Sequence, residues 1–307
     1  MPSPFRLWVI VAILMAIRPS SLAAAAEKAS GEKIFARDNL VAWCIVPFDA
    51  KKRGPEERAE MLARLGFKHF AYDWRAEHLP TFEAEIKALM RKGISLDAVW
   101  FPAALDDDAR KILSALKKHD IKTQLWVTMG DPAPSAKSDK EKVAAAVRAL
   151  RPIADEAGKI GCSVALYNHG GWFGEPEHQI AIIKELKLKN VGLVYNLHHG
   201  HDHLDRFPEL LKNMKPYLVC INLNGMVKDG ESKNRKILPL GQGDLDLQLL
   251  KTIQNSDYHG PIGILGHTQD DVEERLKDNL DGLDWLLPQL KGKPAGPKPR
   301  LRTPVNP

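Results

Sequence analysis

The sequence is poor in cysteine, and it contains no glycine-rich turn of the dinucleotide-binding type. Its three cysteines, Cys44, Cys162 and Cys220, are far apart and have no CxxC spacing. This pattern does not support a zinc ribbon or a disulfide framework, and we expect three buried thiols that pack as small apolar side chains. One disulfide bond with a third, free thiol is the alternative.

Long apolar runs are also scarce. The longest is LWVIVAILMAI, eleven residues that follow the cationic MPSPFR and precede SLAAAAE, where small residues suit cleavage near Ala25. This order is typical of a secretory signal peptide over residues 1–26, and the run is short for a membrane span. We therefore expect an exported protein, periplasmic or secreted, with no stable membrane insertion after cleavage. An uncleaved anchor is the alternative.

The body of the chain lacks an excess of charge of either sign. The formal net charge is +5, but two cations lie in the signal segment and five in the tail, and neither segment contains an acid. Residues 27–290 therefore carry a net charge of −2, which does not indicate nucleic-acid binding. The Pro-rich basic tail, residues 291–307, is expected to be disordered.

What the sequence does contain is a repeated strand–helix pattern. Amphipathic segments such as 55–66, 81–93 and 107–120 begin near Pro, Thr or Asp and end near cations or Gly, as helices favour. They alternate with β-branched or aromatic runs at 39–46, 68–74, 95–101, 122–129, 163–168, 191–197, 217–224 and 261–267. Eight such units predict a single-domain (β/α)8 TIM barrel over residues 27–290. A doubly wound open sheet is the alternative.

Aromatic and polar residues gather at the predicted C-terminal strand ends, where TIM barrels place their chemistry. Flat aromatic faces suit the C–H faces of sugars, although each Trp taken singly would also fit a barrel core. A cation before the Gly-Gln-Gly loop, Arg235 or Lys236, could neutralise an oxyanion or an acidic sugar. The candidates for substrate binding are Trp100, Trp126, Tyr167, Trp172, Asn196, Asn222, Asn224 and Arg235.

Histidine is concentrated in YNLHHGHDH, residues 195–203, which holds four of the eleven histidines. Strand alternation directs His169, His267 and one of His198 and His199 toward the same pocket. Imidazole and carboxamide groups would suit Zn, Mn or Co better than Ca or Mg. No inward carboxylate occurs on the last four strands. His201 and His203 are expected to be solvated.

Several motifs resemble the xylose isomerase-like TIM barrels, a family of sugar-phosphate isomerases and epimerases, sugar lyases and apurinic endonucleases. They are VALYNHGG, NVGLVYNLHHGH, CINLNG and PLGQGDLDLQLLKTI followed by GPIGIL, and the resemblance covers residues 39–287. The most specific match is the Gly-x-Gly-x-x-Asp of Gly241, Gly243 and Asp246 before a helix and a strand. The resemblance implies a TIM barrel with a metal-assisted proton transfer on sugars.

The family's metal site does not carry over. The resemblance implies Glu on the fifth strand, Asp and then His three residues later on the sixth, His on the seventh and Glu on the eighth. Only the sixth-strand His is present, as His199. The other positions hold Tyr167, Asn196, Asn222 and Leu265 or Gly266.

Two functions remain open. In the first, the protein is a sugar isomerase, epimerase or related lyase that abstracts a proton next to a carbonyl, with His169 as base and Asp73 and Glu175 as the next candidates. His199 and His267 would then hold one divalent metal (Zn, Mn or Co), or the pocket would act without a metal.

In the second, the barrel binds carbohydrate without catalysis. Both functions predict a small sugar as partner. DNA repair conflicts with the signal peptide, the charge of the body and the missing metal carboxylates.

Overall fold

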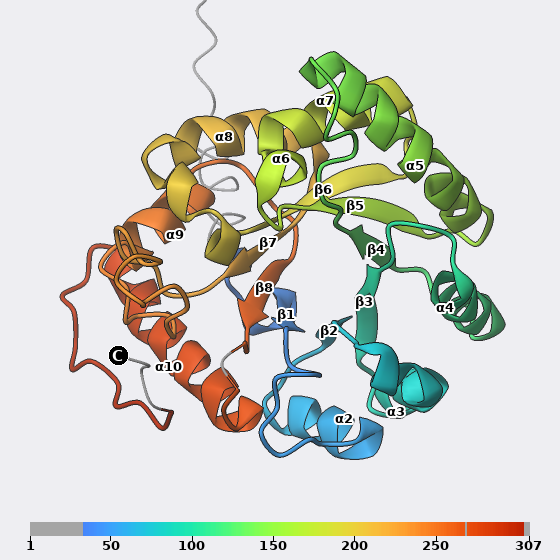
Figure 1. The fold of residues 1–307 in the computed structure, drawn as a ribbon. Helices are drawn as coiled ribbons and strands as arrows, with labels where there is room; N and C mark the ends of the chain where they lie inside the picture. The colour runs from blue at the N-terminus through green and yellow to red at the C-terminus, as the bar shows by residue number, and fades with distance from the viewer. Residues whose placement is uncertain (1–32, 268, 304–307) are drawn as a thin grey trace, which may run out of the picture.

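The computed structural model describes residues 33–267 and 269–303, and in it eight parallel strands close into one barrel. Figure 1 shows them in chain order around the ring. They are β1 Leu40–Trp43, β2 His69–Tyr72, β3 Ser95–Phe101, β4 Gln124–Val127, β5 Ser163–Tyr167, β6 Val191–Asn196, β7 Leu218–Leu223 and β8 Ile262–Leu265. All eight predicted strands are present. Because β1 pairs with β8 from Leu40 to Trp43, the open sheet is excluded and the TIM barrel is confirmed.

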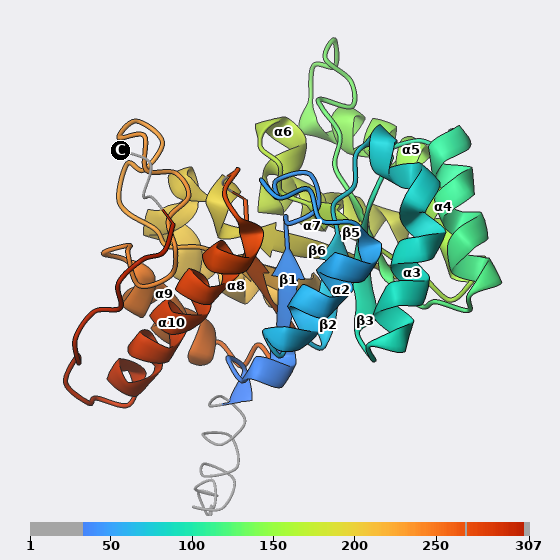
Figure 2. The same ribbon diagram turned by 90° about the horizontal axis from the view of Figure 1, so that it is seen from below.

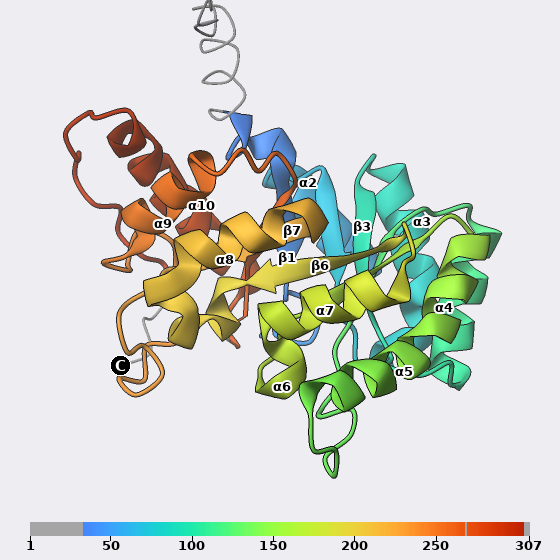
Figure 3. The same ribbon diagram turned by 90° about the horizontal axis from the view of Figure 1, so that it is seen from above.

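Helices form the outer layer of the barrel (Figure 1). They are α2 Pro55–Arg64, α3 Phe82–Arg91, α4 Asp107–Lys118, α5 Asp139–Lys159, α6 Gly171–Gly174, α7 Pro176–Leu186, α8 Phe207–Met214, α9 Asp246–Gln254 and α10 Val272–Leu290. Short 3-10 segments are η1 Arg37–Asn39, η2 Ala76–Thr81, η3 Leu197–His199, η4 His201–Arg206 and η5 Lys215–Tyr217. Figure 3 shows α7 and α8 beside β6, whose end carries the histidine-rich segment.

Local chemistry determines where several helices begin. Asp106 caps α4 because its carboxylate accepts the N–H of Ala109 at 2.8 Å, and Ser138 caps α5 in the same way. Proline occupies the first turn of α2 and of α7, where its missing N–H costs nothing. In the part of the chain that is described, no helix combines the length and the apolar character needed to cross a bilayer.

Large aromatic side chains fill the barrel. Trp43 and Trp126 point into it, each 1% exposed, with ring centroids 4.7 Å apart in a T-shaped contact. Small residues on neighbouring strands leave room for them, among them Ala71, Ala98 and Ala165. The interior below the strand ends is therefore solid. Cys44, Cys162 and Cys220 are all buried free thiols, as predicted.

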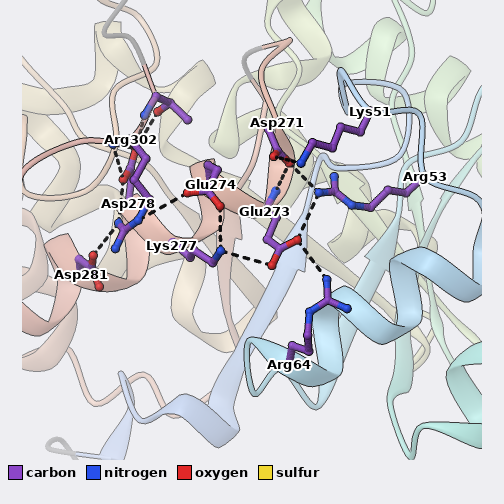
Figure 4. A network of polar contacts seen from close by, with 11 residues as sticks. Lys51, Arg53, Arg64, Asp271, Glu273, Glu274, Lys277, Asp278, Asp281 and Arg302 are labelled. Carbon is purple, nitrogen blue, oxygen red and sulfur yellow. Dashed lines mark hydrogen bonds and ion pairs between the residues drawn. The ribbon is translucent and has the colours of Figure 1, made fainter.

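Ionic contacts join the first and the last strand–helix units of the barrel (Figure 4). Arg53, 8% exposed, lies in the loop after β1 and pairs with Asp49 at 2.8 Å. It also pairs with Asp271 at 2.7 Å and Glu273 at 3.2 Å, at the start of α10. Removing one partner of such a buried pair typically costs about 3–5 kcal/mol, because the other charge stays buried. These contacts hold the loop after β8 against the loop after β1.

The chain after α10 follows this helix (Figures 1 and 2). The buried carboxylate of Asp278 accepts the backbone N–H groups of Arg302 at 3.0 Å and Thr303 at 2.9 Å. Trp285 donates its ring N–H to the carbonyl of Gly296 at 2.8 Å. Residues 293–303 form neither helix nor strand, and these contacts hold them against α10. The predicted signal peptide and the last four residues of the tail lie outside the described residues.

Candidate functional site

A small cavity of about 60 Å³ lies at the C-terminal ends of the strands. Side chains from the ends of β1, β2, β3, β5, β6 and β8 meet there, as the barrel topology predicts. Its wall consists of Trp43, Cys44, Phe48, Asp73, Arg75, Trp100, Tyr167, His169, His198, His199 and His267. Both His169 and His267 therefore face the cavity predicted for them.

Four imidazoles make up one side of this wall. His169 follows β5, His198 and His199 follow β6, and His267 follows β8. The ring centroids of His198 and His199 are 3.9 Å apart in a stacked contact, and those of His169 and His199 are 4.4 Å apart. His267 lies 5.5 Å from His198. The structure thus unites three separate loops in a single histidine cluster.

The histidine cluster is held in its neutral form. Burial, followed by the charges of His169 and Lys236, lowers the pKa of His199 to about 3, and burial followed by Arg75 and Arg275 lowers that of His267 to about 4. Burial also lowers the pKa of His198 and of the more exposed His169. At neutral pH each ring therefore offers one N–H donor and one lone pair. The buried Nδ1 of His198 has no hydrogen-bond partner in the part of the chain that the structure describes.

Asp73 provides the carboxylate of the cavity wall. It follows β2 and is 2% exposed, and its Oδ1 accepts the backbone N–H groups of Ile45 at 3.2 Å and Val46 at 3.1 Å. Its Oδ2 is buried without a partner in the described structure. Burial raises the pKa of Asp73 to about 6. One oxygen is thus fixed by the backbone, while the other remains unpaired.

Arg75 lies two residues further along the same chain segment. Its Nη1 donates to the backbone carbonyls of Asp73 and Trp74, both at 2.9 Å, and its guanidinium lies 5.4 Å from the ring centre of Phe48. Sequence reasoning missed Arg75, Phe48 and Cys44 as wall residues. Arg75 could have been found from the sequence, because it lies two residues after the candidate Asp73 and side chains two apart on an extended chain face the same side.

The predicted aromatic residues separate into two groups. Trp100 and Tyr167 line the cavity, with their rings 4.9 Å apart. Trp126 lies deeper in the barrel and donates to Gln124 at 2.8 Å. Trp172 stacks on His178 at 4.2 Å and donates to Asp139 at 2.7 Å. The structure therefore places Trp126 and Trp172 outside the cavity wall.

The predicted amide residues are buried around the cavity but do not line it. Asn196 donates to the hydroxyl of Tyr167 at 2.6 Å, which fixes the phenol ring. Asn222 accepts from the thiol of Cys220 at 3.6 Å, in space left by Gly263, whose added Cβ would lie 1.7 Å from the amide oxygen. Asn224 donates to the carbonyl of Gly225 at 2.9 Å.

Two predicted charged residues also lie elsewhere. Glu175 pairs with Arg206 at 2.9 Å and with His203 at 3.3 Å, and it does not line the cavity. Arg235 is absent from the wall too, and its backbone N–H donates to Gly230 at 2.6 Å within the loop after β7. The sequence does not show which loops lie beside one another, so these ion pairs could not be foreseen.

The expectation that His203 is solvated is wrong. Its side chain is buried, with Nδ1 3.0 Å from the hydroxyl of Tyr195. His201 is partly buried, and its Nε2 lies 2.9 Å from the carbonyl of Lys236. Both histidines lie on η4 and connect the loop after β6 to neighbouring segments. They differ from His198 and His199 in position rather than in solvation.

The residues present do not fit the metal site that the family resemblance implies. Within residues 33–267 and 269–303, no group of three or more His, Cys, Asp or Glu is placed to hold a metal ion. Tyr167 replaces one family carboxylate and is hydrogen-bonded to Asn196. His199 and His267, the predicted ligands, share the cavity wall with Asp73, but the three side chains are not placed as one ligand group.

Comparisons with known proteins agree with this fold. The family model for the xylose isomerase-like TIM barrel matches residues 59–289. No curated protein matches the chain by sequence.

Among solved structures, 3-keto-D-glucoside 4-epimerase, YcjR, from E. coli has a TM-score of 0.58 at 18% identity, covering 81% of this chain and 98% of its own. D-psicose 3-epimerase in the presence of D-fructose has a TM-score of 0.56 at 16% identity, covering 83% and 98%. The IOLI protein with a binding zinc atom has a TM-score of 0.63 at 14% identity, covering 82% and 99%. At these identities the likeness shows the fold.

Proposed function

The chain belongs to the xylose isomerase-like TIM barrel family, and we propose that it is a sugar isomerase or epimerase, or a related lyase, that removes a proton next to a carbonyl. The observation that carries this proposal is the unpartnered carboxylate oxygen of Asp73 in the wall of a cavity that also holds four neutral imidazoles. Two proteins of similar fold are named as sugar epimerases, which supports the substrate class.

Asp73 is assigned as the base. With its pKa raised to about 6 by burial, it is largely ionised at neutral pH and more basic than an ordinary carboxylate. The N–H groups of Ile45 and Val46 hold one oxygen and orient the other for the substrate C–H. This choice differs from the sequence-based preference for His169, whose pKa is lowered.

His198 and His199 are assigned to the substrate carbonyl. Removal of the proton places negative charge on the carbonyl oxygen, and donors already in place stabilise that charge. A neutral imidazole N–H can serve this purpose, as in triosephosphate isomerase, where a histidine of lowered pKa polarises the carbonyl. Burial keeps both rings neutral here. No step is assigned to a metal, because the donor set does not fit one.

His169 is assigned to the second proton transfer. It follows β5, and β3 and β4 separate that strand from β2, which carries Asp73. Inversion at a carbon requires a proton to leave on one side and to arrive on the other, so two groups from different parts of the wall are needed. Burial lowers the pKa of His169, but its side chain is exposed, so the ring can take up a proton from solvent and pass it to the substrate carbon.

The cavity volume limits what enters. At about 60 Å³ the cavity is small beside typical ligand pockets of about 300–1,000 Å³. We assign it to the carbonyl end of the substrate. The remaining carbons would lie outside, against the exposed His169 and the partly exposed Trp100.

Proton exchange tests the proposed function. Sugars incubated with the protein in D2O should gain deuterium at the carbon next to the carbonyl, as seen by NMR, in at least one ketose or aldose of a broad panel. Asp73→Asn should lower this exchange about a hundredfold or more, the scale for removing a general base. His169→Asn should keep exchange but lose inversion. Glu175→Gln, outside the cavity, serves as the matched control and should leave exchange unchanged.

Two outcomes would contradict this assignment. If Asp73→Asn exchanges at the wild-type rate, the base lies elsewhere. If no sugar exchanges although sugars bind at the cavity, the carbohydrate-binding barrel without catalysis is the better function.

Export stays a proposal that rests on the N-terminal sequence alone. If residues 1–26 form a cleaved signal peptide, the protein recovered from its native host should begin at or close to Glu27. N-terminal sequencing of that protein decides the matter, and a chain that still begins at residue 1 contradicts export by cleavage.

A further inference from the structure

Arg75 is exposed, and it forms no ion pair with the described residues. Its side chain contacts two backbone carbonyls and the face of Phe48, and no carboxylate of the described residues lies within ion-pair distance. Arg75 nevertheless lies in the wall of the cavity.

Asp73 is the carboxylate of the wall, and its charge and that of Arg75 act on each other without a direct ion pair. The histidine cluster adds polar groups and no negative charge. Asp73 directs one oxygen to two backbone N–H groups, and its other oxygen is the one assigned to the substrate C–H. Lys236, a second cation on the histidine side, is paired with Glu231. The wall thus holds a carboxylate and a guanidinium that form no ion pair with each other in the described structure, so the guanidinium can still bind an anionic ligand at the cavity mouth.

From this arrangement we infer that the substrate is an acidic sugar whose carboxylate is bound by Arg75. A planar guanidinium matches a carboxylate through two parallel N–H···O bonds, and Nη2 and Nε of Arg75 have no hydrogen-bond partner among the described residues. A phosphate is less suited, because it carries more negative charge than a carboxylate. The cavity wall supplies the single guanidinium of Arg75 to balance that charge. This inference rests on the proposed function and narrows its substrate class.

The position of Arg75 also fits the chemistry. It lies two residues from Asp73 and donates to the backbone carbonyl of that residue at 2.9 Å, so a sugar whose carboxylate is held by Arg75 lies beside the proposed base. Arg75 is thus assigned to binding the substrate carboxylate and to orienting the sugar in the cavity.

Binding measurements test the inference. Calorimetry would compare D-galacturonate and D-glucuronate with the matched neutral sugars D-galactose and D-glucose, and with D-glucose 6-phosphate. The wild type should prefer the uronates to the neutral sugars by about tenfold or more, and Arg75→Gln should remove that preference. Arg75→Lys, which keeps the charge but not the fork, should retain part of it. Arg235→Gln, a cation outside the cavity, should keep all of it.

The outcomes separate this inference from the proposed function. Equal affinity for uronates and neutral sugars, or no binding by either, overturns the inference. A preference for D-glucose 6-phosphate also overturns it, because the bound group would then be a phosphate and not a carboxylate. If neutral sugars exchange deuterium and Arg75→Gln exchanges equally well, the proposed function stands and the inference fails. If uronates bind through Arg75 without exchange, the ligand class stands and the catalysis fails. Circular dichroism confirms that each variant is folded.

Discussion

Asp73 is subject to two opposing demands. A buried carboxylate is costly when it is charged, and burial raises its pKa to about 6. The proposed base must nevertheless be charged to accept a proton. The N–H groups of Ile45 and Val46 and the charges of Arg75 and Arg58 favour the ionised form, but they do not outweigh burial. The protein therefore gives up folding free energy at this position above pH 6.

This cost predicts a pH-dependent difference in stability. The folded-state pKa of Asp73 lies above the ordinary value, so between about pH 4 and 6 the folded state binds more protons than the unfolded state. The free energy of unfolding contributed by Asp73 should then fall as the pH rises through this window, by about 3 kcal/mol for a shift of about two units. Urea denaturation of the wild type and of Asp73→Asn at pH 4 to 8 measures it.

Subtracting the two curves removes the other titrating groups that both proteins share. The difference should change across pH 4 to 6 and be constant above pH 7. Parallel curves over the whole range would show that Asp73 is not perturbed in the folded state.

Single residues also show the limit of sequence reasoning at the site. Position at a C-terminal strand end grouped Trp100 and Trp126 together, and alternation along a strand tells which side of the barrel a side chain faces. It does not tell the height along the barrel axis, so Trp126 lies in the packed interior whereas Trp100 lines the cavity. Asn196 and Asn222 face inward for the same reason and lie outside the cavity wall.

The loop between β7 and α9 is the element that depends most on one side chain. Asp246, 2% exposed, accepts the backbone N–H groups of Met226 at 2.7 Å, Gly241 at 2.7 Å and Gly243 at 3.0 Å. These donors come from both ends of the loop, and an added Cβ at Gly243 would lie 2.2 Å from the N of Met226. The Gly-x-Gly-x-x-Asp motif is thus a clamp that closes the loop.

Replacing this carboxylate should open the loop. Asp246→Asn keeps one acceptor oxygen and turns an N–H donor toward backbone donors, so at least one buried N–H loses its partner. We expect a loss of about 1–3 kcal/mol in the free energy of unfolding, the cost of an unsatisfied buried donor. Faster tryptic cleavage after Lys228 or Lys233 should accompany it. The exposed neighbour Asp244 provides the control, since Asp244→Asn should change stability by less than about 0.5 kcal/mol.

The elements themselves were the predictable part of the structure. Strands such as β3 and β6 can be predicted from β-branched and aromatic runs between charged helical segments. Capping by Asp106 and the proline at Pro55 indicate where α4 and α2 begin. Contacts between loops are not encoded locally. The pairing of Glu175 with Arg206, and the meeting of Arg75 with the histidine cluster, depend on the closed ring that brings those loops together.

For the whole molecule, ring closure joins residues that are distant along the chain. Leu40 pairs with Ile262, and Arg53 pairs with Asp271. During synthesis the free edge of β1 has no partner on that side until β8 has left the ribosome. An exposed strand edge invites pairing with other chains. A nascent chain that stops short of Ile262 is thus a template for aggregation rather than a smaller domain. The last strand to be synthesised determines whether the edge of the first strand is covered.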